Sequence, residues 1–110
     1  MIRVTFAGSG ADIRSVTVSG HSGFAAAGSD IVCAAVTSAV RLCSAILDDA
    51  AGLGCRADVD AAAAAITLSL PSGLPEDKRL LANQVLTGLR LYLQALAEEY
   101  PENIKIAVPL

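Results

Sequence analysis

Runs in which apolar and polar residues alternate predict the strands of this protein. Alternation places every second side chain on one face of a strand, which is the pattern of a sheet with one buried face. Gly8-Ser9-Gly10 indicates a turn between the first two runs. The alanines at 61–64 favour helix by propensity, so the boundary between the middle strands stays open. Five strands are predicted, at residues 2–6, 15–19, 55–60, 65–70 and 103–108.

Two longer segments have the periodicity of helices. The first covers residues 30–51; it begins with Asp30, a good N-cap, and ends at Gly52. The second covers residues 76–100 and ends before Pro101. The order β-β-α-β-β-α-β with short connections predicts a single α+β domain over residues 1–110, a mainly antiparallel sheet with both long helices packed on one face.

Each predicted helix has only a narrow polar stripe. A helix at the surface of one sheet needs a single apolar face, and these helices have enough apolar residues for a second contact. We therefore expect the two helices to form the apolar interface of a homodimer. The stripes are Thr37, Arg41, Ser44 and Asp48 in the first helix and Asn83, Thr87, Arg90, Gln94 and Glu98 in the second.

Composition supports that expectation and limits the partners. The 110 residues are 54% hydrophobic but only 4% aromatic, which is more apolar surface than one small domain can bury. The net charge is −3 and no Lys/Arg cluster occurs, so direct nucleic-acid binding is not expected and a basic polypeptide suits better.

Nothing in the sequence indicates export or membrane insertion. The first residues lack the basic and apolar regions of a signal peptide, and the apolar runs at 31–40 and 61–70 are too short to span a bilayer. The three cysteines are an odd number and form no C-x-x-C pair. We expect a cytoplasmic protein with no membrane partner.

The candidate chemistry lies in Gly20-His21-Ser22-Gly23 and in Cys33, twelve residues after the histidine. Cys33 falls in the first turn of the first predicted helix, where the dipole and the unpaired N–H groups favour thiolate. His21, the only histidine, can hold the proton and later protonate a leaving amine. These residue types predict a catalytic cysteine with His21 on a glycine-rich loop.

Several alternatives stay open from the residues alone. A buried free cysteine or a histidine in a turn is commonly structural, and Cys43 and Cys55 are interpreted that way. Asp30 could orient His21, although capping is the preferred role. The N–H groups of Cys33 and Ala34, or of residues 20–29, could form an oxyanion hole.

Other site types fit less well. The Thr37 hydroxyl could lie near the thiol, but a bond back to the Cys33 carbonyl is preferred. One histidine and three scattered cysteines do not make a metal site, and the glycine-rich segments lack a phosphate-loop pattern, so no metal and no cofactor are expected.

The segment from Gly20 to Thr37, with its Asp30-Ile31-Val32-Cys33-Ala34-Ala35-Val36 run, closely resembles the signature of the ribosomal-processing cysteine protease (Prp) family. The resemblance covers essentially the whole chain. It implies a homodimeric endopeptidase that removes the N-terminal extension of large-subunit ribosomal protein number twenty-seven, just after paired phenylalanines. It also implies that His21 and Cys33 are catalytic and that Asp30 matches the family's aspartate.

Two further expectations concern the loop and the alternative functions. Gly20, Ser22, Gly23 and Phe24 are the possible substrate loop, and we expect residues 20–29 to act as a gate that brings His21 to Cys33 when substrate binds. A binding module for ribosome assembly, which captures a ribosomal-protein segment without cutting it, is the alternative; a thiol redox protein is a weaker one.

Overall fold

The structure of the protein is a computed structural model that describes residues 1–9, 12–21, 23, 25–26 and 30–107. The element order is the predicted β-β-α-β-β-α-β, which confirms the α+β fold class. The elements are β1 (Ile2–Ser9), β2 (Asp12–Ser19), α1 (Ile31–Ser44), the π-helical continuation η1 (Ala45–Ala50), β3 (Arg56–Asp60), β4 (Ala65–Ser69), α2 (Glu76–Glu99) and β5 (Ile104–Ala107).

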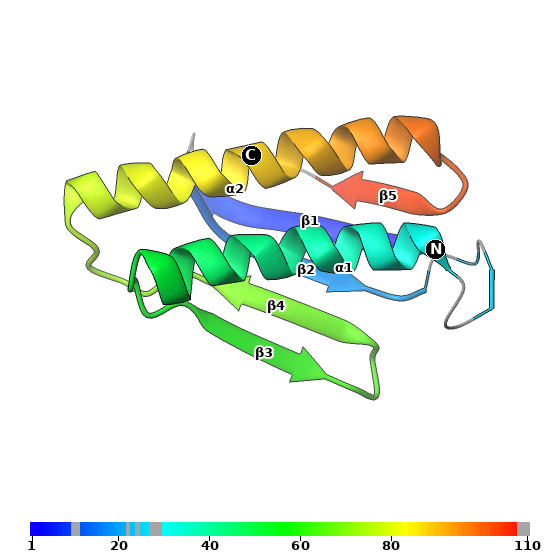
Figure 1. Ribbon diagram of the computed structural model, residues 1–110, viewed down its shortest axis with the longest axis horizontal. Helices are drawn as coiled ribbons and strands as arrows, with labels where there is room; N and C mark the ends of the chain where they lie inside the picture. The colour runs from blue at the N-terminus through cyan, green and yellow to red at the C-terminus, as the bar shows by residue number, and fades with distance from the viewer. Residues whose placement is uncertain (10–11, 22, 24, 27–29, 108–110) are drawn as a thin grey trace.

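The strands form one five-stranded sheet in the order β3-β4-β2-β1-β5. All neighbouring strands are antiparallel except β1 and β5, which are parallel because α2 returns the chain before β5 begins. Both helices lie on the same face of the sheet, and the β3–β4 hairpin extends beyond them at one edge (Figure 1). This uncovered hairpin is the part of the fold that matters most for the site.

The core lies between the sheet and the two helices. Strand β1 alternates as predicted, because Ile2, Val4 and Phe6 are all buried while the residues between them are exposed. The helices contribute their apolar faces to the same core: Val32, Val36, Val40 and Leu47 from α1 and η1, and Ala82, Leu86, Leu89, Leu93 and Leu96 from α2.

The first two strands are longer than the sequence pattern predicts. Pairing continues from Arg3 opposite Ser19 to Ser9 opposite Asp12, with a shift in register between Ala7 and Gly8. A Cβ at Gly8 would lie 1.9 Å from the Asp12 carbonyl oxygen, so only glycine fits this irregularity. The glycine therefore permits a bulge within the hairpin instead of starting a turn.

The alanines between β3 and β4 form a turn and not a helix. Asp60 pairs with Ala65, which leaves only four residues to reverse the chain, too few for a stable helix. The Asp60 carboxylate accepts a hydrogen bond from the Ala63 N–H at 3.1 Å, and Ala64 has a φ of 49°. Register, and not propensity, decides the conformation of this segment.

The first helix is longer than its apolar run alone suggests. Residues 31–40 were expected to be too short to span a bilayer. The helix that contains them, Ile31–Ala50, has 20 continuous helical residues, so the expectation does not hold for the helix as a whole. By length and composition alone this helix could cross a membrane, and it is the only such helix in the part of the chain described. Its face containing Val32, Val36 and Val40 packs in the core, and a core helix meets the same criterion.

Candidate active site

His21 and Cys33 line the same two cavities at the N-terminal end of α1. Cys33 is the third residue of α1 and is half-buried, whereas His21 follows the end of β2 and is exposed. One cavity, about 330 Å³, lies between α1 and the β3–β4 hairpin and is called the hairpin groove below. The other, about 660 Å³, lies on the loop side and includes Asp30 and Thr37. A chain passing through both cavities would pass the thiol.

The backbone at the base of the His21 loop is held from two sides. The Gly20 N–H donates to the Ala64 carbonyl at 3.0 Å, and the His21 carbonyl accepts from the terminal ammonium of Met1. Gly20 has a φ of 85°, and a Cβ there would lie 2.4 Å from the Met1 carbonyl oxygen. Glycine is therefore required at this position on both counts.

The His21 imidazole forms no hydrogen bond with the Cys33 thiol within the described part of the chain. The two side chains share the cavities without being joined, an arrangement common in unliganded active sites. Of the four residues predicted as a substrate loop, the structure describes Gly20 and Gly23. Ser22 and Phe24, on which much of the expected gate depends, lie outside the described residues.

Asp30 is the N-cap of α1. One of its carboxylate oxygens accepts a 2.9 Å hydrogen bond from the Cys33 N–H, and its own carbonyl accepts from the Ala34 N–H at 3.1 Å. Both N–H groups proposed for an oxyanion hole are therefore already engaged, and that expectation is wrong for Cys33 and Ala34. The Gly20 N–H is engaged as well, so an oxyanion donor from the loop has to come from residues after Gly20.

Thr37 lies one turn after Cys33 and is exposed to both cavities. Its hydroxyl makes no hydrogen bond to any residue that the structure describes, so the preferred bond back to the Cys33 carbonyl is not formed. The hydroxyl is instead available to a molecule that occupies the cavities.

Cys43 and Cys55 line neither of the two cavities at the site. Burial raises the pKa of the Cys43 thiol above its ordinary value. Burial, and then the negative charge of Asp48, raises the pKa of the Cys55 thiol. Both effects oppose thiolate formation, which suits the structural roles predicted for these two residues. Over the ranges described, no group of three or more His, Cys, Asp or Glu side chains could hold a metal ion.

The β3–β4 hairpin is a part of the site that the sequence pattern does not reveal. Val59, Ala61, Ala64 and Ile66 all line the hairpin groove together with His21 and Cys33. The sequence pattern predicts strands at Val59 and at Ile66, but the closeness of the hairpin to α1 depends on the strand order. The signal in the sequence is a valine between two aspartates, Asp58 and Asp60; in the structure this Val59 lies on an edge strand and is 73% exposed.

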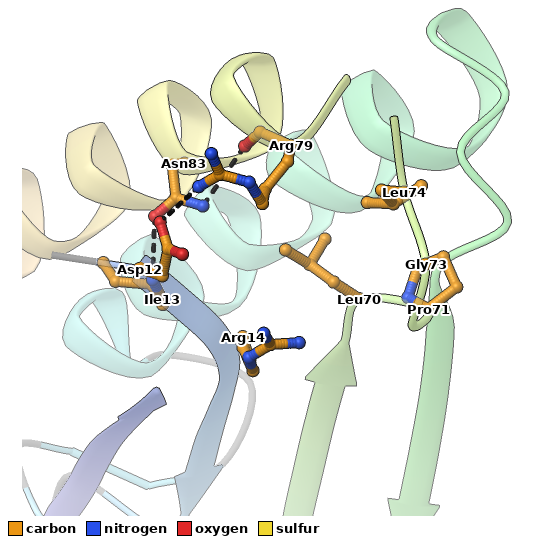
Figure 2. A pocket seen from close by; sticks show the side chains of 9 residues that line it. All are labelled: Asp12, Ile13, Arg14, Leu70, Pro71, Gly73, Leu74, Arg79 and Asn83. Carbon is orange, nitrogen blue, oxygen red and sulfur yellow. Dashed lines mark hydrogen bonds and ion pairs between the residues drawn. The ribbon is translucent and has the colours of Figure 1, made fainter. Parts of the chain in front are cut away.

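A further cavity, about 230 Å³, lies at the other end of β2 and shares no lining residue with the site. Figure 2 shows how its polar side chains pair with one another. Arg79 forms a 2.7 Å ion pair with Asp12, and the Asn83 side-chain oxygen accepts the Ile13 N–H at 2.7 Å. These contacts hold the start of α2 against β2, so the paired side chains of this cavity have a structural role.

The chain resembles one known protein family along almost its whole length. The sequence model of the family described as "Cysteine protease Prp" matches residues 1–105. None of the curated proteins compared with the chain is similar to it in sequence.

Three solved structures share the fold. The ribosomal processing protease Prp from S. aureus, with a covalently linked product peptide, has a TM-score of 0.83 at 21% identity and covers 98% of this chain and 99% of its own. SMU.848 from Streptococcus mutans has a TM-score of 0.81 at 25% identity, covering 98% and 93%. The S. aureus protease with a substrate peptide has a TM-score of 0.74 at 20% identity, covering 97% and 96%.

Proposed function

The chain belongs to the cysteine protease Prp family and is a cysteine protease, and from this premise we propose that Cys33 and His21 are its catalytic pair. We further propose that it removes the N-terminal extension of large-subunit ribosomal protein number twenty-seven. The observation that carries the proposal is that His21 and Cys33 line the same two cavities at the start of α1. The S. aureus relatives with a substrate peptide and a covalently linked product peptide support a peptide substrate.

The chemistry follows from the residue types. His21 accepts the thiol proton of Cys33, and the thiolate attacks the carbonyl carbon of the scissile peptide bond. The tetrahedral intermediate collapses as His21 gives that proton to the leaving amine, and the acyl group stays on sulfur as a thioester. A water molecule, activated by His21, then hydrolyses the thioester and restores the thiol. No cofactor takes part in this proposed sequence.

Asp30 supports this chemistry by fixing the first turn of α1. Its bond to the Cys33 N–H holds the nucleophile's own backbone. The N-terminal end of the helix, which carries a partial positive charge, therefore lies at the nucleophile. All three cysteines are free, which fits our proposal that the protein works in the reducing cytoplasm.

The experiment uses a peptide that spans the extension and its junction, with the products identified by mass spectrometry. The intact protein should cut it once, and Cys33→Ala and His21→Ala should each abolish the cut while leaving the circular dichroism spectrum unchanged. Cys43→Ala is the matched control and should still cut. Cleavage by Cys33→Ala would show that the nucleophile is misassigned; tight binding without cleavage by the intact protein would favour the capture module instead.

We also propose that the protein is a homodimer joined through its helices. The second apolar flank of α1 and η1 is not fully buried and lines a groove of about 500 Å³ between α1 and α2; it consists of Ala35, Ala39, Leu42 and Ile46. Leu42 is 62% exposed and Tyr92, across the groove, is 51% exposed. A surface as apolar as this is typical of a permanent interface.

Gly88 in the same groove favours a second copy as the occupant. Glycine inside a helix costs about 0.5–1 kcal/mol relative to alanine, yet a Cβ at Gly88 would meet nothing within 4 Å. Packing within one chain therefore gives no reason for a glycine here. Close approach of another helix does give one, because a missing side chain lets two backbones come together.

A further inference from the structure

The cavity of about 230 Å³ at the far end of β2, called the distal cavity below, contains a charge that the contacts of the protein leave unbalanced. Three charged residues line it: Asp12, Arg14 and Arg79. Asp12 and Arg79 neutralise each other through their 2.7 Å ion pair. The Arg14 guanidinium forms no hydrogen bond or ion pair with any residue that the structure describes. Arg14 is therefore available to a negatively charged ligand.

The other polar groups of the distal cavity are already used within the protein. The Asn83 side-chain oxygen accepts the Ile13 N–H at 2.7 Å, and the Asn83 side-chain nitrogen donates to the Arg79 carbonyl at 3.2 Å. Glu76 lies 3.9 Å from Arg79, but its side chain is 81% exposed and does not line the cavity, so solvent screens its charge. Figure 2 shows the Arg14 side chain apart from this cluster. The cluster holds the cavity in shape and leaves Arg14 to a ligand.

A β-bulge brings Arg14 to the distal cavity. Ser15 pairs with Ala7 on β1 and Ile13 pairs with Gly8, so Arg14, between them, is an extra residue in β2. In a regular strand Ile13 and Arg14 would point to opposite faces, yet both line this cavity. A bulge re-aims side chains in this way. A Cβ at Gly8 would lie 1.9 Å from a backbone carbonyl oxygen, so the glycine that permits the bulge is required.

One wall of the distal cavity is apolar. It is formed by Leu70, Pro71 and Leu74, in the connection from β4 to α2. Leu70 and Leu74 pack against the core, and the Leu70 N–H donates to the Arg14 carbonyl at 2.9 Å. The wall is therefore joined directly to the bulge that carries the guanidinium. The cavity is smaller than the pockets of about 300–1,000 Å³ that bind drug-sized molecules, so its ligand has to be small.

We propose that the distal cavity binds a carboxylate that carries a small apolar group, with the carboxylate on Arg14 and the apolar group against Leu70 and Leu74. A guanidinium presents parallel N–H donors that match the two oxygens of a carboxylate. Burial of the apolar group adds to the affinity. The cavity shares no lining residue with the proposed catalytic site, so this ligand and a peptide substrate can be bound at the same time. A free organic acid and the C-terminus of a polypeptide that ends in an aliphatic residue both present this chemistry.

The test is a titration of the intact protein with isocaproate, followed by heteronuclear NMR of the backbone N–H groups. The signals of Arg14, Gly73 and Leu74 should shift and saturate with a Kd on the order of 1 mM, typical of a ligand with so few atoms. Isocaproamide keeps the shape without the charge, and acetate keeps the charge without the apolar group. Each analogue should bind about tenfold more weakly. Equal binding of isocaproate and isocaproamide would overturn the proposal.

Substitutions locate the carboxylate. Arg14→Gln should weaken the binding of isocaproate about tenfold and leave the weak binding of isocaproamide unchanged. Arg14 is exposed, so this variant should keep the fold, which the other signals of the same spectrum report. Arg3→Gln is the matched control: Arg3 is an exposed arginine of the same sheet outside the cavity, and this variant loses the same charge but should bind like the intact protein. Unchanged affinity in Arg14→Gln would overturn the assignment.

A second pair of probes distinguishes the two sources of the carboxylate. The peptide Gly-Ser-Gly-Leu is titrated with a free C-terminal carboxylate and with an amidated C-terminus. If only the free carboxylate form shifts the same signals, the site accepts the C-terminus of a polypeptide. If neither peptide binds while isocaproate does, the ligand is a free organic acid. If both peptides bind equally well, the carboxylate is not recognised and the proposal fails.

Discussion

The backbone N–H of Cys33 donates a 2.9 Å hydrogen bond to the carboxylate of Asp30. This single contact starts helix α1, holds the proposed nucleophile in its first turn and removes the Cys33 N–H from the donors available to a reaction intermediate. The cap and the proposed active site therefore share the residues Asp30 and Cys33. A change at Asp30 should affect both stability and cleavage.

Replacing Asp30 separates its capping role from a role in orienting His21. Asp30→Ala should lower the free energy of unfolding by about 1 kcal/mol, the usual cost of losing an N-cap. Asp30→Asn keeps a capping oxygen without the charge and should restore that stability in urea titrations. If capping is the only role, Asp30→Asn should also restore kcat/KM on the extension peptide. A stable Asp30→Asn that cleaves as poorly as Asp30→Ala would show that the charge acts on His21.

The fold was predictable because its signals are local. Alternation in β1 and the 3.6-residue period of the helices depend on neighbours in sequence, and both predict the correct elements. The turn at Ala61–Ala64 was not predictable from propensity, because the pairing of Asp60 with Ala65 decides it. Local helix propensity is overridden where the pairing of two strands leaves too few residues between them to form a helix.

The site was predictable only in part, for the same reason. Cys33 and His21 have chemistry that can be recognised in sequence, whereas Val59 becomes a neighbour of Cys33 only through the strand order β3-β4-β2. The engaged N–H groups of Cys33 and Ala34 likewise follow from the position at which the helix begins. Long-range pairing and exact helix starts are the properties that the pattern of residues leaves undetermined.

Asn83 should matter for stability and not for catalysis. Its side-chain oxygen accepts the N–H of Ile13, a fully buried residue, at 2.7 Å. Asn83→Leu leaves that N–H without its acceptor, so the free energy of unfolding should fall by about 1–3 kcal/mol. The control is Thr87→Val, one turn later on the same polar stripe, which should change stability much less. Reduced kcat/KM in folded Asn83→Leu would mean that the distal cavity is coupled to the site.

Gly88 provides a direct test of the dimer. Gly88→Arg should place a long charged side chain in the groove between α1 and α2 and yield a monomer by light scattering at micromolar concentration. Gln94→Arg introduces the same charge on the polar stripe of α2, outside the groove, and should remain dimeric. A dimer in Gly88→Arg would place the interface on another surface, and a monomeric intact protein would refute the dimer itself.

Asp48 should control how fast Cys55 reacts with iodoacetamide. Burial is the larger cause of the raised Cys55 pKa, and the Asp48 carboxylate adds to it by repelling the thiolate. Asp48→Asn removes the repulsion and leaves the burial, so the pKa of Cys55 should fall part of the way towards its ordinary value. At a fixed pH near 8, below that pKa, a larger fraction of Cys55 is then thiolate, and alkylation should become faster.

Cys43 is the internal control for this measurement, because burial alone raises its pKa. Its alkylation rate, read from the same digests, should be unchanged in Asp48→Asn. The difference between the variants should vanish at high pH, where Cys55 is ionised in both proteins. An acceleration that persists there, or that appears equally at Cys43, would indicate that Asp48→Asn loosens the η1 turn and exposes both thiols, which would remove the electrostatic explanation.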